Sequence, residues 1–262
     1  MSDVAAYSVI SPTRIPPHAP PAPGQLSAAA RAPQKDGQRC TACSMRSICM
    51  PQGLTPAELQ RIESFIYPSR TIKQGETIYR ANDSFQSIYA VRAGSFKTVV
   101  MHRDGREQVT GFHLAGDSLG LDGVCSGRHS CDAMALEDSK VCIIPFHLLE
   151  AMCREVKVVQ QHLHRMMGGE IVRESSQMML LGTMSAEQRV ATFLLNLSDR
   201  LRMRGYSPAE FHLRMTREEI GSYLGIKLET VSRMLSKFQR DGLVDTRGKD
   251  IRILDHEGLV NV

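Results

Sequence analysis

The sequence predicts an α+β protein in which a small antiparallel barrel or sandwich precedes a long helix and a helix-turn-helix domain. Three observations support this class. Short β-type segments separated by glycines fill residues 67–145, apolar residues recur at helical spacing over 146–181, and residues 216–235 have the spacing of a helix-turn-helix. A chain of 262 residues with 42% apolar residues is long enough for two such domains.

Composition narrows the class of protein. The net charge of +4 permits nucleic-acid binding without requiring it. No apolar run reaches the roughly 18 to 20 residues that span a bilayer, and the first residues lack the pattern of a signal peptide. We therefore expect a cytoplasmic protein. No nucleophile elbow, P-loop, catalytic carboxylate pair or dinucleotide fingerprint occurs, so we do not expect an enzyme.

The N-terminal region contains the most distinctive cysteines. Residues 1–36 are rich in Pro, Ala and Ser, which predicts a flexible tail, and residues 37–55 form a cysteine loop. Cys40, Cys43 and Cys49 lie close together without a secondary-structure pattern, so the loop can wrap a metal centre. Seven cysteines in a reducing compartment favour such ligation over disulfides.

The fourth ligand is not decided by the residues alone. Structural zinc would need another Cys or His nearby, and none follows promptly, so zinc stays an alternative. An iron–sulfur cubane needs four thiolates, but one of them can be distant in sequence. The candidates for a distant ligand are Cys125, Cys131, Cys142 and Cys153.

A β-rich sensor domain is predicted over residues 56–150. Thr55, Pro56 and Glu58 predict a capped helix that ends at Phe65. Asp104-Gly105 is a hairpin signal. The predicted strands include residues 77–79, 87–91, 96–100 and 140–144.

A long dimerisation helix is predicted over residues 151–183. Its apolar stripe repeats at spacings of three and four, which suits a coiled-coil seam, although packing on the strand domain would explain it too. Glu174 interrupts the stripe, and two such carboxylates facing each other would oppose association. The dimer would then be conditional. The predicted seam consists of Met167, Ile171, Glu174, Met178 and Leu181, with Leu163 preceding it.

Residues 184–262 are predicted to form a winged helix-turn-helix domain. Thr216 and Glu219 make a capping box that starts the first helix. Gly221 is small where the second helix must cross, Gly225 permits a left-handed turn, and Val231 fills the space between the helices. Residues 243–254 suggest a β-hairpin wing, which favours a DNA-binding domain over an ordinary helical hairpin.

The second helix has the side chains that a recognition helix needs. Glu229, Ser232 and Arg233 share one face near its N-terminus, the part that enters the major groove. Arg233 can bind guanine in bidentate fashion, and Glu229 can accept from cytosine. The residues expected to contact phosphates are Lys227, Lys237, Arg240, Arg247 and Lys249.

Over residues 38–254 the chain resembles the FNR family, the oxygen-sensing members of the cyclic-AMP receptor protein superfamily. Taken together, the matching motifs are highly specific. They are Cys40-x2-Cys43-x5-Cys49, residues 109–114, residues 141–146, residues 178–181, and residues 221–225 with 229–233.

The resemblance implies a cupin-like β-roll sensing domain, a long dimerisation helix and a C-terminal winged helix-turn-helix. It implies a [4Fe–4S] cluster with Cys142 as the fourth ligand, and a homodimer when the cluster is loaded, which oxygen disperses. It also implies recognition of double-stranded DNA with a twofold-symmetric site, and contact of the loop 102–107 with RNA polymerase. Glu174 matches the family position that discourages dimerisation without the cluster.

Some features depart from the family or leave rivals open. Arg103 and Arg106 make the polymerase-facing loop basic, and the tail is longer than the family needs. A cyclic-nucleotide site needs an acidic residue and an Arg followed by Ser or Thr, and residues 120–122 and 128–130 do not reproduce them in register. Further alternatives are heme sensing through His102, His113 or His129 and a stand-alone electron carrier. An exposed cluster would also react with nitric oxide, which would be a second signal.

Overall fold

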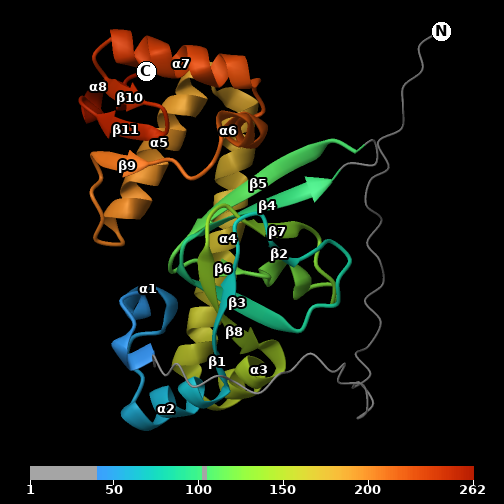
Figure 1. Ribbon diagram of the computed structural model, residues 1–262. Helices are drawn as coiled ribbons and strands as arrows, with labels where there is room; N and C mark the ends of the chain where they lie inside the picture. The colour runs from blue at the N-terminus through green and yellow to red at the C-terminus, as the bar shows by residue number, and fades with distance from the viewer. Residues whose placement is uncertain (1–39, 102–104) are drawn as a thin grey trace, which may run out of the picture. The chain divides into compact units, whose positions relative to one another are not determined.

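The computed structural model describes residues 40–101 and 105–262; the tail predicted over 1–36 lies outside them. Figure 1 shows a β domain, the long helix α4 (Lys157–Thr183), and a helical domain that carries a small sheet. The predicted α+β class, with its β-roll, long helix and winged helix-turn-helix, is confirmed. None of the described helices is both long enough and apolar enough to span a membrane.

The helical elements follow the chain in this order: η1 (Cys40–Ala42), α1 (Arg46–Cys49), α2 (Pro56–Phe65), η2 (Leu121–Gly123), α3 (Phe146–Glu155), α4 (Lys157–Thr183), α5 (Ala186–Arg202), α6 (Arg217–Leu224), α7 (Leu228–Arg240) and α8 (His256–Val260). The strands are β1 (Tyr67–Ile72), β2 (Thr77–Tyr79), β3 (Ser87–Ala93), β4 (Ser95–Met101), β5 (Glu107–Leu114), β6 (Ser118–Leu119), β7 (Asp132–Ala135), β8 (Ser139–Pro145), β9 (Glu210–His212), β10 (Val244–Arg247) and β11 (Asp250–Ile253).

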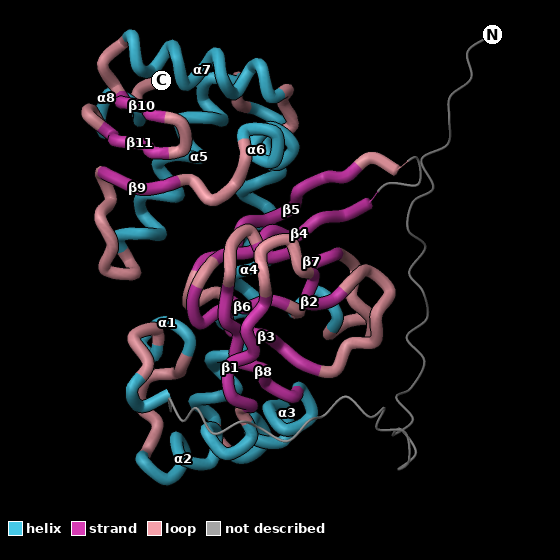
Figure 2. The backbone as a smooth tube through the Cα atoms, in the orientation of Figure 1, coloured by secondary structure: helices cyan, strands magenta, loops and turns pink. Residues whose placement is uncertain are grey.

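The β domain is built from two antiparallel four-stranded sheets. Their strand orders are β1-β8-β3-β6 and β2-β7-β4-β5, and they enclose buried residues such as Ile72, Phe96 and Val141. Antiparallel sheets pair in this way when each buries one face against the other. Figure 2 shows the β4–β5 hairpin projecting past the other strands of its sheet. Met101 pairs with Glu107 near its tip, while Asp104 of the predicted turn lies outside the described residues.

The region of helical spacing over 146–181 forms two helices, because the structure divides it at Val156. That residue has extended backbone angles, φ −119° and ψ 100°, between α3 and α4. The break has a packing reason. Because of the break, Met152 of α3 and Leu163 of α4 both belong to one apolar cluster with Ile62 of α2. In a straight helix the two side chains would lie one behind the other along the helix axis.

Capping residues fix where the helices begin. The predicted capping boxes at Thr55 and Thr216 both form, each with the side chain and backbone bonds in place. Ser185 makes a third capping box at the start of α5. The C-terminal domain then packs α5, α6, α7 and the β9–β11 sheet around one core, in which Leu224 and Phe238 are fully buried.

Candidate functional sites

The cysteine loop is held against the β domain and the start of α4. Met45 and Met50 are buried, and the Thr41 N–H donates to Glu63 of α2 at 2.8 Å. On the other side, the ring Nε2 of His162 on α4 lies 3.3 Å from the Cys49 carbonyl oxygen, which accepts its hydrogen bond. The loop therefore has anchors on two helices besides its own short turns.

The structure brings Cys40, Cys43 and Cys49 close to Cys142, which lies in the middle of β8. All four thiols are partly buried. Burial, together with the neighbouring cysteine thiols, raises the pKa of Cys40 to about 11 and that of Cys49 to about 12. Burial also raises the pKa of Cys142, while Arg92 beside it lowers that pKa. Every pair among the four thiols lies within electrostatic reach.

The remaining cysteines have other surroundings. Cys125 is exposed, and Cys153 is buried in the apolar cluster of α2 and α3. The Cys131 thiol donates to Asp122 at 3.6 Å. Within residues 40–101 and 105–262, no three Cys, His, Asp or Glu side chains are grouped as ligands of a single metal ion.

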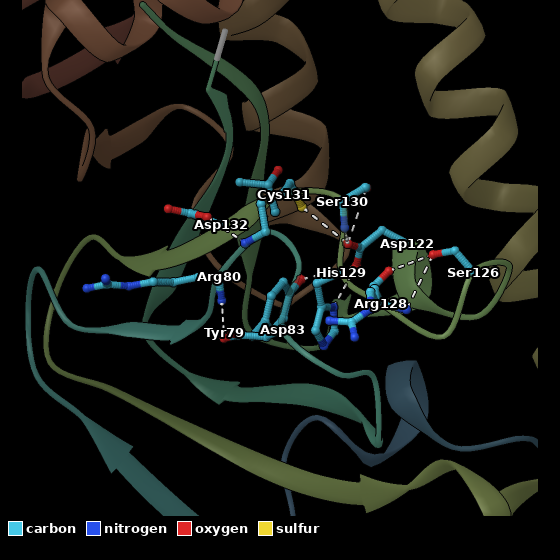
Figure 3. Close-up of polar contacts among 12 residues, drawn as sticks. Tyr79, Arg80, Asp83, Asp122, Ser126, Arg128, His129, Ser130, Cys131 and Asp132 are labelled. Carbon is cyan, nitrogen blue, oxygen red and sulfur yellow. Dashed lines mark hydrogen bonds and ion pairs between the residues drawn. The ribbon is translucent and has the colours of Figure 1, made fainter. Parts of the chain in front are cut away.

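A separate polar cluster surrounds Asp122 in the β domain (Figure 3). Its carboxylate accepts from the Ser130 N–H at 2.7 Å and lies 3.3 Å from His129 Nδ1. The His129 ring stacks on Tyr79 with centroids 3.7 Å apart. Arg128 instead donates to the Asn82 carbonyl at 2.7 Å and is exposed. The aspartate thus occupies the backbone N–H that an anionic ligand would use there.

A pocket of about 700 Å³ lies between this cluster and α4. Its wall includes Asp122, His113 and Tyr223, together with all five residues of the predicted dimer seam. His113 is buried; its Nε2 lies 3.3 Å from the Thr98 hydroxyl, and its Nδ1 has no hydrogen-bond partner among the described residues. His129 is likewise buried, whereas His102 lies outside the described residues.

The middle of α4 exposes apolar side chains. Ile171 is 65% exposed and Met178 is 67% exposed, and Glu174 between them is exposed as well. At the two ends of the stripe, Leu163 is buried and Leu181 packs on the C-terminal core. An apolar stripe exposed over several turns is the surface that a second copy of the helix could cover.

The recognition helix α7 lies along the edge of the C-terminal domain (Figure 1). Val231 is fully buried towards α6, whereas Glu229 and Arg233 are exposed and Ser232 is partly exposed. The turn before it forms as predicted, with Gly225 left-handed at φ +62°. A Cβ on Gly221 would lie 2.6 Å from the Ile226 carbonyl oxygen, which explains the glycine there.

The predicted phosphate-contacting cations have different surroundings. Lys237 forms an ion pair with Glu187 of α5. Lys249 donates to the Arg214 carbonyl at 3.2 Å, and Arg247 lies 3.5 Å from Asp245. Lys227 stands at the N-cap of α7, and a helix N-terminus favours a phosphate. Arg240 lies in its last turn.

Polar contacts between the β domain and the C-terminal domain were missed by the sequence analysis. Lys97 of β4 forms a 2.8 Å ion pair with Glu219 of α6, and both side chains are largely buried. The Val109 N–H donates to the Ser222 hydroxyl at 2.9 Å. These partners are more than a hundred residues apart, so no local sequence pattern could have indicated them.

Comparison with known proteins explains this combination of domains. Residues 69–156 match the model of the cyclic nucleotide-binding domain, and residues 188–262 match that of the Crp-like helix-turn-helix domain. The chain is 41% identical to the fumarate and nitrate reduction regulatory protein of Escherichia coli K12 over 223 residues, which cover 85% of this chain and 89% of that protein. The chain belongs to the CRP/FNR family of transcription regulators.

Other CRP/FNR proteins extend the likeness. The transcriptional regulatory protein btr of Bordetella pertussis is 41% identical over 86% of this chain and 93% of its own length. The structure of FixK2 from Bradyrhizobium japonicum superposes with a TM-score of 0.69 at 34% identity, and covers 74% of this chain and 96% of that one. As a member of this family, the protein is a DNA-binding transcription regulator that works as a dimer.

Proposed function

We propose that this CRP/FNR regulator responds to oxygen through a [4Fe–4S] cluster held by Cys40, Cys43, Cys49 and Cys142. The observation that carries the proposal is the mutual proximity of these four thiols, three from one loop and one from β8. A cubane takes one thiolate on each iron, so its ligands lie farther apart than those around a single ion. The donor set is therefore chemically suited to the cluster.

The chain's own residues explain what cluster binding would change. When bound, the cluster would supply an oxygen-labile iron–sulfur centre at this place. The four thiolates would then tie the loop to β8, while His162 and the apolar cluster tie the same loop to α4. Without those thiolate bonds, the loop keeps only its weaker contacts. Ordering of the cysteine loop and the position of α4 are thus coupled through His162 and the apolar cluster.

Dimerisation is the proposed output of that coupling. Covering the exposed side chains of Ile171 and Met178 would stabilise the dimer by about 25 cal/mol per Å² of apolar surface buried. Glu174 opposes association because two carboxylates would approach each other in the seam. The balance between the two terms makes the dimer conditional, so that cluster loading favours it and oxygen disperses it.

The dimer would place two copies of α7 on a twofold-symmetric site in double-stranded DNA. Arg233 and Glu229 are exposed for base contacts, with Ser232 between them. We also propose that the exposed residues 105–107, from the loop 102–107, contact RNA polymerase. Arg106→Ala should then lower transcription from a bound promoter without lowering DNA affinity.

A cyclic nucleotide is a less favoured input, although the domain matches that family model. The Asp122 carboxylate holds the Ser130 N–H and would repel a phosphate placed there, and Arg128 points to Asn82 instead. Titration calorimetry with cyclic AMP should give no binding heat. A stoichiometric binding heat would restore the nucleotide-sensor alternative.

The experiment that tests the cluster measures iron and acid-labile sulfide per chain, with the visible spectrum, on protein purified without oxygen. We expect about four of each, with absorbance that changes after brief exposure to air. Cys142→Ser should abolish assembly, and Cys153→Ser, at a buried cysteine of α3 outside the proposed ligand set, is the matched control. Zinc, or unchanged iron in Cys142→Ser, would contradict the assignment.

A further inference from the structure

The turn between β5 and β6, residues 114–117, contacts the cysteine loop and the DNA-binding domain at once. Its backbone is tightly fixed: the Gly116 N–H donates to the Val91 carbonyl at 2.7 Å, and the Leu114 N–H donates to the Asp117 carboxylate at 2.8 Å. Gly116 has φ +93°, in the left-handed region that favours glycine. The turn thus has one well-defined conformation.

On one side, Ile48 of the cysteine loop lies directly on Gly116. A Cβ at Gly116 would be 2.9 Å from Ile48 Cγ2 and 3.3 Å from its Cβ. Ile48 stands immediately before Cys49, in the short helix α1. A change in the path of the loop around its cysteines would therefore move the side chain that covers this turn.

On the other side, Asp117 binds two arginines of the DNA-binding domain, one in the last turn of α5 and one just after the helix. Arg200 and Arg204 each donate to its carboxylate at 2.5 Å, and Arg204 also donates to the Ala115 carbonyl at 2.5 Å. The Asp117 side chain is 11% exposed and that of Arg204 is 4% exposed. Charge pairs this well buried are strong and directional, because little water screens them.

We propose that this turn couples the cysteine loop directly to the orientation of the DNA-binding domain, by a route separate from the dimer seam. Ile48 keeps Gly116 in place, and Asp117, the next residue, holds α5. The proposal rests on the proposed function, since the cluster is what would order the loop. It predicts that DNA affinity depends on Ile48 even when the cluster and the dimer are intact.

The test compares variants of the full chain loaded with cluster without oxygen. Ile48→Ala removes Cγ1, Cγ2 and Cδ1, whereas Ile48→Val removes only Cδ1 and keeps the Cβ and the Cγ2 that lie nearest Gly116. Ser47→Ala, at an exposed position in the same helix, is the control for the loop. For each variant we would measure iron and sulfide content, the sedimentation coefficient, and the affinity for one DNA duplex. That duplex is the one that the wild-type protein selects from random sequences.

We expect Ile48→Ala to keep cluster and dimer but to bind the duplex at least about fivefold more weakly, the lower end of typical coupling between sites. Ile48→Val and Ser47→Ala should bind as the wild type does. Asp117→Asn should also weaken binding, and adding Ile48→Ala to it should cause little further loss, since both act through one turn.

Different failures have different meanings. A wild-type chain without cluster would refute the proposed function itself. Normal affinity in a loaded Ile48→Ala dimer would overturn the coupling alone, as would losses that simply multiply in the double variant. If Ile48→Ala fails to assemble the cluster, the loaded Asp117→Asn dimer decides, and normal affinity there refutes the coupling.

Discussion

His113 should make the β domain less stable as the pH falls below neutrality. The side chain is 5% exposed, and one ring nitrogen has no partner among the described residues. Burial, opposed by Asp117 and helped by Arg173 and Arg200, lowers its pKa from 6.5 to about 3. The folded protein therefore keeps this imidazole neutral at a pH where the unfolded chain protonates it.

The sign and size follow from that difference. Because the pKa is lower in the folded state, the unfolded state binds more protons between pH 6.5 and about 3. The stability that the neutral imidazole contributes is therefore fully present above pH 6.5 and is lost as the pH falls towards 3. Between pH 7 and pH 5 the loss is about 2 kcal/mol, at 1.36 kcal/mol per pH unit below 6.5. This figure depends little on the folded-state value, because that value lies well below pH 5.

The assay measures the free energy of local unfolding of β4 and β5 by hydrogen exchange with mass spectrometry, at pH 7 and pH 5, for the wild type and for His113→Gln. A local probe is needed because a chain of two domains need not unfold in one step. Burial also lowers the pKa of His162, so only the difference between the two proteins isolates His113. We expect His113→Gln to lose about 2 kcal/mol less than the wild type. An equal loss in both would refute the reasoning.

Three further predictions concern the dimer and the DNA-binding domain. Glu174→Ala should raise the dimer content of the protein in air, measured by sedimentation; an all-monomer result would contradict the seam. Arg233→Ala should cost about 1–3 kcal/mol at one base position and relax the choice there; equal weakening on every duplex would exclude base readout by Arg233. Gly221→Ala should destabilise the C-terminal domain by about 1–3 kcal/mol in thermal melts, because its Cβ would meet the Ile226 carbonyl oxygen; an unchanged melt would show that the helices can separate freely.

Local chemistry explains why parts of this fold were predictable. Thr216 and Gly225 act within a few residues of themselves, one by capping α6 and the other by its left-handed backbone, and both do so as expected. The β-branched segment at 87–91 likewise forms β3. The break at Val156 was not predictable, since the apolar periodicity runs on through it and the cluster that Met152 and Leu163 share forms only in the folded chain.

The candidate site shows the same limit. Spacing within the chain indicated Cys40, Cys43 and Cys49, but four other cysteines were equivalent as the distant ligand until the resemblance was used. In the structure Cys142 lies within electrostatic reach of the loop thiols. Which thiols meet depends on how β8 pairs with β3, and that is a long-range property that neighbouring residues do not encode.

The contacts of the first helix of the helix-turn-helix limit how the DNA-binding domain can move. Glu219 accepts from the Thr216 N–H at 2.6 Å and from Lys97 at 2.8 Å. One carboxylate therefore both caps the N-terminus of α6 and binds this helix to β4. Burial opposes its charge, but Lys97 keeps its pKa below the usual range. Reorienting the domain would leave the carboxylates of Glu219 and Asp117 without their partners. Each broken buried pair would cost about 3–5 kcal/mol of free energy unless water or DNA takes the place of the lost partner. A rearrangement of the cysteine loop can therefore reorient the domain only if new contacts offset this cost. A second subunit and the phosphates of DNA could supply such contacts.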